Sequence, residues 1–144
     1  MAKKKILDYD YKTTAVLAYC QARDFLAAAE AIDKCKLSKP TMVNISFACE
    51  LYFKAIYIWN NKCQEIVGEH ALKELFNMLD APLQKRIIEE TKIDNWERFI
   101  NDSSTAFNDW RYVYEKDKCF WGHSGSLFVL ATVLDKICEE KIII

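Results

Sequence analysis

Arg111 lies in an aromatic run that reads Phe-Asn-Asp-Trp-Arg-Tyr-Val-Tyr-Glu over residues 107–115. An arginine beside an aromatic patch can hold a phosphate through paired hydrogen bonds or stabilise its developing charge. Glu115 follows one helical turn later, so these two side chains can instead form an ion pair on a partly solvated face. Tyr112 is expected to point away from the core. The run is a candidate phosphate-binding element, with the helix ion pair as the alternative.

The chain has two histidines, His70 and His123, and both are candidate catalytic residues. Histidine side chains titrate near neutral pH and therefore serve as general acids and bases. His123 lies in the segment Cys-Phe-Trp-Gly-His-Ser-Gly over residues 119–125, just before the last expected helix. Aromatic loop residues of this kind also pack over the end of a bundle or into a dimer contact. His70 is expected in the first turn of a short helix.

Glu50 and Lys54 are charged residues within an otherwise apolar segment. Their spacing of four, with Glu before Lys, is the favourable order for an ion pair on a helix. The pair is either a buried or half-buried structural contact or a polar element of a binding site. Lys73, three residues after His70, adds a second cation to the candidate site.

Several classes of chemistry are excluded by the absence of their motifs. The sequence contains no phosphate-binding G-x-x-x-x-G-K-[ST] loop, no G-x-G-x-x-G fingerprint and no H-E-x-x-H pair. Its two histidines do not form the Glu-x-x-His pairs of a di-iron bundle. The six cysteines are scattered singly, without the close pairs of zinc sites. We therefore expect neither a metal nor a cofactor.

The composition favours one helical domain spanning residues 1–144, with its core over about 10–140. The 144 residues include only three glycines and two prolines, too few for the many turns of an all-β fold. A net charge of −1 argues against a protein that coats a polyanion. No signal peptide or membrane-length apolar run is present, and the unpaired cysteines suit a reduced, cytoplasmic protein.

Apolar residues recur every three or four positions, which predicts packed helices. Long helices are expected over about 11–34, 41–60, 94–116 and from 124 onward, with Ser38 capping the second. The second is apolar on all sides and is therefore central. Two short helices lie between the second and third, separated at residues 80–82, with Leu83, Ile87 and Ile88 inward. The tail at 141–144 is an apolar end that looks exposed and could dock on a neighbouring molecule. These elements make an all-α bundle of four long helices with one or two additional short ones.

Three passages together resemble the HEPN domain family. They read Ala-Cys-Glu-Leu-Tyr-Phe-Lys-Ala over residues 48–55, Glu-His-Ala-Leu-Lys-Glu-Leu-Phe over 69–76, and Trp-Arg-Tyr-Val-Tyr-Glu over 110–115. The first is similar to the family's helix with Glu four residues before Lys-Ala. The second resembles its His-x-Leu-x-x-Leu helix start, and the third a W-R-Y-x-Y-E pattern of one branch. Their order and spacing agree over nearly the whole chain.

The resemblance implies an up-down four-helix bundle with an extra short helix, often a homodimer. It also implies partners such as a cognate antitoxin or a nucleotidyltransferase, in toxin–antitoxin or phage-defence settings. Many family members are metal-independent ribonucleases in which a His follows an Arg after four to six residues. Arg111 matches that Arg, but residues 116–118 read Lys-Asp-Lys, and His123 comes twelve residues after Arg111.

Two function classes stay open from the sequence. In the first, the protein is a regulatory module that binds a nucleotide, RNA or a partner protein, without a membrane role. The residues expected to bind are Glu50, Lys54, Lys73, Arg111, Tyr112 and Glu115. In the second, it is a metal-independent endoribonuclease in which Arg111 steadies the scissile phosphate and His70 or His123 activates the 2′-hydroxyl.

Overall fold

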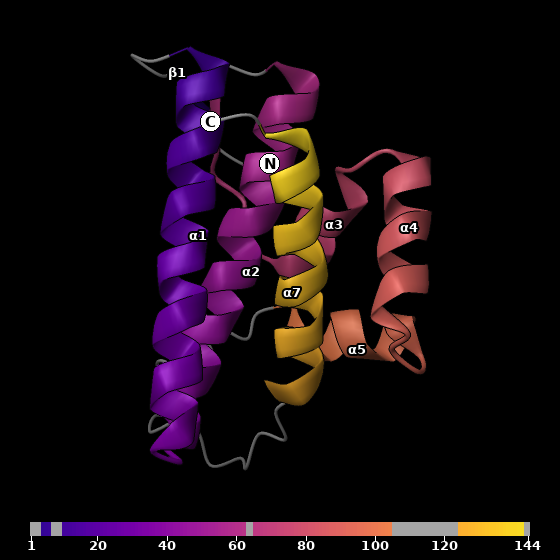
Figure 1. The fold of residues 1–144 in the computed structure, drawn as a ribbon. Helices are drawn as coiled ribbons and strands as arrows, with labels where there is room; N and C mark the ends of the chain where they lie inside the picture. Colours follow the sequence, from indigo (N-terminus) through magenta and orange to yellow (C-terminus); the bar gives the residue numbers. More distant parts are fainter. Residues whose placement is uncertain (1–3, 7–9, 63–64, 105–123, 143–144) are drawn as a thin grey trace.

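Three long helices lie side by side in the computed structural model, and shorter helices pack beside them (Figure 1). The structure describes residues 4–6, 10–62, 65–104 and 124–142. In this part of the chain the elements are β1 (Lys4–Ile6), α1 (Tyr11–Lys34), α2 (Ser38–Asn61), β2 (Glu65–Val67), α3 (Leu72–Asn77), α4 (Ala81–Thr91), α5 (Trp96–Ser103) and α7 (Ser124–Lys141). The packing of α2 against both α1 and α7 makes a helical bundle, as expected.

The first helix begins and ends where the sequence predicts. Asp10 caps α1 by accepting a hydrogen bond from the backbone N–H of Thr13 at 2.7 Å. This bond satisfies one of the N–H groups that the first turn leaves free, and it holds the pKa of Asp10 below its usual range. The buried residues of α1 include Ala15, Ala22 and Ala29, whose small side chains let α2 approach closely.

The second helix is central, because α2 packs against α1, α7 and α3. It begins at Ser38 with Leu37 as its N-cap, so the expected cap at Ser38 is wrong by one residue. The carbonyl of Leu37 accepts hydrogen bonds from both the N–H and the hydroxyl of Thr41, at 3.1 and 2.8 Å. Because Leu37 takes the N-cap position through these two bonds, Ser38 becomes the first residue of the helix and does not cap it.

The helix expected over 94–116 is shorter in the described chain, where α5 ends at Ser103. Its C-cap, Ser104, turns its backbone carbonyl toward α3 and accepts the N–H of Leu72 at 2.9 Å. This bond joins the end of α5 to the start of α3. Residues 105–116 of the expected helix lie outside the described residues.

Two apolar residues differ from their expected environments. Leu83 and Ile87 are buried on α4, whereas Ile88 is 37% exposed and its expected inward position is wrong. One residue of a helix turns by about 100°, so Ile88 leaves the face that packs on α7. Ile142 is only 3% exposed and donates its N–H to the carbonyl of Cys138, so the expected exposed tail is wrong at that residue.

A short antiparallel pair of strands was not expected. β1 pairs with β2 in the register Lys4↔Val67, Lys5↔Ile66 and Ile6↔Glu65. Each strand has three residues, too few to produce a readable alternation of polar and apolar side chains. The chain is therefore mainly, but not wholly, helical.

A buried tyrosine joins the three long helices. The hydroxyl of Tyr52 on α2 donates a hydrogen bond to Oδ1 of Asp135 on α7 at 2.9 Å. Arg23 of α1 brings its Nε to 3.8 Å from the same oxygen and lies over the ring of Tyr19. Burial and the nearby Asp135 carboxylate raise the pKa of Tyr52 well above its usual range. Tyr52 therefore stays protonated and serves as a hydrogen-bond donor inside the bundle.

Ion pairs join α4 to α7 at the surface. Arg86 contacts Glu90 on its own helix and reaches Glu140 on α7 at 2.7 Å. Lys136 of α7 lies 3.6 Å from Glu90. The hydrogen bond from Arg86 lowers the pKa of Glu90.

The described ranges hold neither a membrane-spanning helix nor a disulfide. No helix there has both the length and the hydropathy to cross a bilayer. Cys20, Cys35, Cys49 and Cys138 all carry free thiols, as expected. Burial raises the pKa of the Cys49 and Cys138 thiols, which keeps them protonated.

Tyr52→Phe should lower the free energy of unfolding by about 1–2 kcal/mol, because it leaves a carboxylate oxygen of Asp135 without its buried donor. Urea unfolding followed by circular dichroism measures the change. Tyr57→Phe on the same helix is the control, since Tyr57 is only partly buried and water can replace its hydroxyl contacts. Equal effects of the two substitutions would contradict a bridging role for Tyr52.

Glu90→Gln should reduce stability near neutral pH and have little effect in acid. Because the folded-state pKa of Glu90 is lowered, its contribution is complete above the usual glutamate pKa and is lost as the pH falls through the lowered value. In thermal melts from about pH 7 to about pH 3, the melting temperatures of the two proteins should therefore converge as the pH falls below the usual glutamate pKa of about 4.3. A stability difference that stays constant over this range would contradict the assignment.

Candidate functional site

Glu50 is the buried charge at the centre of the candidate site. It lies in the middle of α2 and is 1% exposed. Lys54, one turn later and with a side chain 13% exposed, brings its Nζ to 2.9 Å from Oε2 of Glu50. A buried carboxylate without a cation is strongly disfavoured, which explains the pairing. The ion pair predicted from the spacing of these residues is confirmed, and it belongs to a larger cluster.

His70 completes that cluster from the segment that precedes α3. Its Nδ1 lies 2.8 Å from the same Oε2 of Glu50, whereas its side chain is 62% exposed. The structure therefore gathers Glu50, Lys54 and His70, which were chosen from the sequence as candidate site residues. His70 itself lies before α3, which begins at Leu72 with Ala71 as N-cap, so its expected position in the first helical turn is wrong.

The contact with Glu50 decides which nitrogen of the His70 ring carries the proton. An ionised carboxylate only accepts hydrogen bonds, so Nδ1 must donate and therefore carries a hydrogen. The Nζ of Lys54 lies 3.4 Å from that nitrogen; both groups are donors, and this approach is a contact without a hydrogen bond. In the neutral ring Nε2 then has a free lone pair, and in the protonated ring it is a donor.

The two oxygens of Glu50 have unequal surroundings. Oε2 receives both Lys54 and His70, whereas Oε1 is buried without a hydrogen-bond partner among the described residues. A buried acceptor left in this way costs stability, and such groups often mark functional sites. Because Lys54 and His70 share one oxygen, a change at either side chain alters the environment of the other.

Backbone hydrogen bonds hold the segment that carries His70. Oε1 of Glu69 accepts the N–H groups of His70 and Ala71, each at 2.9 Å. Ser104 accepts the next two, the N–H of Leu72 through its carbonyl and that of Lys73 through its hydroxyl. The peptide on both sides of His70 is therefore bonded to fixed acceptors.

Of the remaining predicted site residues, only Lys73 lies in the described part of the chain. Lys73 lies in the first turn of α3 and is half-buried, three residues after His70. Arg111, Tyr112, Glu115 and His123 lie outside the described residues, and their roles stay predictions. Over the ranges described, no group of three His, Cys, Asp or Glu side chains is arranged to hold a metal ion.

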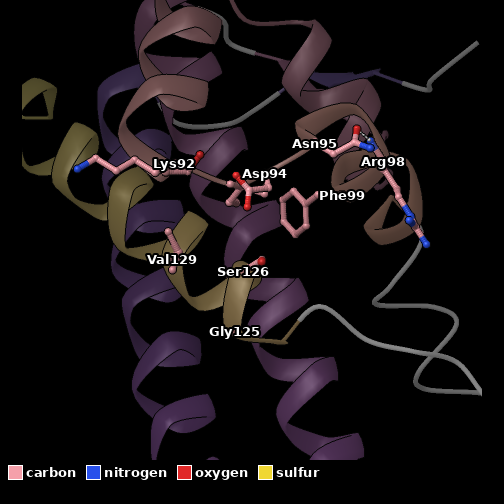
Figure 2. Close-up of a pocket in the computed structure, with 10 residues that line it drawn as sticks. Lys92, Asp94, Asn95, Arg98, Phe99, Gly125, Ser126 and Val129 are labelled. Atoms are coloured by element: carbon pink, nitrogen blue, oxygen red, sulfur yellow. Dashed lines mark hydrogen bonds between the residues drawn. The ribbon is translucent and has the colours of Figure 1, made fainter.

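A separate pocket of about 580 Å³ lies between the α4–α5 connection and the start of α7 (Figure 2). Its lining includes Lys92, Asp94, Arg98, Ser126 and Val129. None of the candidate catalytic or binding residues predicted from the sequence lines it. Figure 2 shows the side chains of Lys92 and Arg98 pointing in different directions, so their charges do not converge. The volume suits a small ligand, but the grouped titratable side chains are at Glu50 and His70.

Glu69 and Ser104 are the site-supporting residues that sequence reasoning missed. Glu69 had a local signal, because an acidic residue just before a helix is well placed to accept its free N–H groups. Ser104 had none, since the residue it bonds is 31 positions away in the sequence.

Comparisons with protein-family models, curated proteins and solved structures gave no match for this chain. The resemblance to HEPN domains therefore rests on the sequence passages alone. The function has to be argued from the geometry around Glu50 and His70.

Glu50→Gln should lower the free energy of unfolding by about 2–4 kcal/mol, because Lys54 loses its buried counter-ion. The double variant Glu50→Gln/Lys54→Met should recover part of that loss, since it removes the unpaired charge as well. Urea unfolding of the two single variants and the double variant forms a thermodynamic cycle. Strictly additive effects would contradict an energetic coupling between the two side chains.

Proposed function

We propose that this protein is a HEPN-like regulatory module that binds a ribose phosphate, either in a free nucleotide or in RNA. The observation that carries the proposal is the 2.8 Å contact between Glu50 and His70, which anchors a largely exposed imidazole beside a lysine. Such a ring is held in one orientation and still offers its outer nitrogen to a ligand. The HEPN resemblance supports the same interpretation.

The charges of the cluster suit a ligand that has both hydroxyl and phosphate groups. Glu50 and Lys54 neutralise one another, so the state of His70 determines what the site offers. The neutral ring accepts a hydrogen bond at Nε2, as from a ribose hydroxyl, and the protonated ring donates one to a phosphate oxygen. Lys73 supplies a further cation near His70, and Arg111 is the predicted second phosphate ligand.

The finer architecture is part of the same proposal. We propose an up-down four-helix bundle of the HEPN type with one or two additional short helices. The antiparallel course of α1 and α2 and the common direction of α2 and α7 in Figure 1 are compatible with that topology. A cytoplasmic homodimer, with an antitoxin or nucleotidyltransferase as partner, follows from the resemblance.

A metal-independent endoribonuclease is the second candidate, favoured by one feature of the cluster. A carboxylate that accepts Nδ1–H of a histidine orients the ring and stabilises its protonated form, as a general base requires. Nε2 of His70 would take the proton of a ribose 2′-hydroxyl, and Arg111 would steady the phosphate. His123 is the alternative base in this mechanism.

Binding is tested by fluorescence anisotropy with a labelled mixed-sequence single-stranded RNA, and with unlabelled ADP as a competitor. We expect saturable binding by the native protein and a loss of about tenfold or more in His70→Ala and Lys73→Ala, which each remove a charged or polar contact. Lys85→Ala is the matched control, because Lys85 is a highly exposed lysine on α4. Competition by ADP would identify the nucleotide as the recognised unit.

Two results separate the candidates or overturn both. Cleavage of the same RNA in EDTA that disappears in His70→Ala would establish the ribonuclease, whereas bound and intact RNA would establish the module. An equal loss of affinity in Lys85→Ala and Lys73→Ala would show only non-specific attraction between charges. Absence of binding to either RNA or ADP would refute the ribose-phosphate proposal.

A further inference from the structure

Ser104 connects the end of α5 to the start of α3 through two hydrogen bonds. Its carbonyl accepts the N–H of Leu72 at 2.9 Å, and its hydroxyl accepts the N–H of Lys73 at 3.2 Å. The first turn of a helix leaves its N–H groups without partners in the helix. The N-cap of α3 is Ala71, which has no side chain that can accept a hydrogen bond. Ser104 therefore supplies from a distant element the capping that the local sequence lacks.

These bonds continue directly from those made by Glu69. Four successive backbone N–H groups, from His70 to Lys73, have acceptors outside α3. The first two bond to Glu69 and the next two to Ser104. The His70 ring is 62% exposed, so packing contributes little to its orientation. The hydrogen bond to Glu50 and the backbone that carries the ring therefore set its orientation together.

We propose that Ser104 is a positioning residue that keeps His70 in register with Glu50. The proposal deepens the function proposed above and rests on it for its biological meaning. Ser104 bonds to the segment of His70 in space and precedes Arg111 by seven positions in the sequence.

The hydroxyl contribution is isolated by Ser104→Ala, which removes the acceptor for Lys73 and keeps the carbonyl bonded to Leu72. Ser104→Thr keeps a hydroxyl and should restore the native behaviour. Thr132→Ala is the control, because it removes a hydroxyl from an exposed helical residue whose partner is the carbonyl of Phe128 on α7. Thermal melts establish that each variant is folded under the conditions used.

The orientation of His70 is read from the ring-nitrogen NMR signals, which His70→Ala assigns and which distinguish the two neutral tautomers. We expect the native protein to show the Nδ1–H tautomer that Glu50 requires. Ser104→Ala should shift the ring toward the Nε2–H tautomer, whereas Ser104→Thr and Thr132→Ala should not. A helix cap with a purely structural role would lower the melting temperature without changing the tautomer, and that result would overturn the proposal.

The RNA affinity of Ser104→Ala, measured by anisotropy with the same labelled RNA, should fall by about three- to tenfold, because the His70 ring is aligned for the ligand in a smaller fraction of the molecules. A tautomer change in a protein that binds neither RNA nor ADP would refute the proposed function and leave the positioning role established. Native tautomer and native affinity in Ser104→Ala would refute the positioning role and leave the proposed function intact. The experiment can therefore refute the proposed function and the positioning role of Ser104 independently of one another.

Discussion

The burial of one carboxylate, that of Glu50, is the constraint on which the candidate site depends. A charge this far from water must be compensated by a cation or by hydrogen bonds. Lys54 meets the requirement from the same helix, and His70 meets it from a separate segment. Both donors share Oε2, so a single atom sets the positions of two side chains. The orientation of the exposed imidazole is thus a consequence of electrostatics inside the bundle.

The bundle supplies the rigidity that this arrangement needs. α2 is held on three sides, and Tyr52 ties it to α7 through Asp135, with Arg23 of α1 close to the same oxygen. The start of the short helix α3 also depends on hydrogen bonds from residues that lie outside the helix. Glu69 and Ser104 are examples, since their oxygens accept N–H groups that a short helix leaves free. His70 is therefore held both by the buried Glu50 of the core and by the hydrogen bonds at the start of α3.

Binding and catalysis would use the same atoms of this site in different ways. Nε2 of His70 accepts or donates a hydrogen bond in a binding module, and it would take up a proton in a ribonuclease. The pocket beside α5 has volume without a converging set of charged groups, whereas in the Glu50 cluster a buried ion pair holds one exposed imidazole. Chemistry depends more on the second property, because a proton acceptor must be both oriented and accessible.

The sequence by itself determined the features that arise from neighbouring residues. The limits of α1, the break before α4, the buried stripe of α7 and the Glu50–Lys54 pair all follow from spacings of a few positions, over which helical geometry is constant. The tertiary structure alone decided which distant groups meet. Glu50 and His70 are 20 residues apart, and Lys73 and Ser104 are 31 apart. The strand pair and the burial of Ile142 likewise depend on contacts between separate elements. No local sequence pattern predicts these long-range contacts, because they form only when the helices pack together.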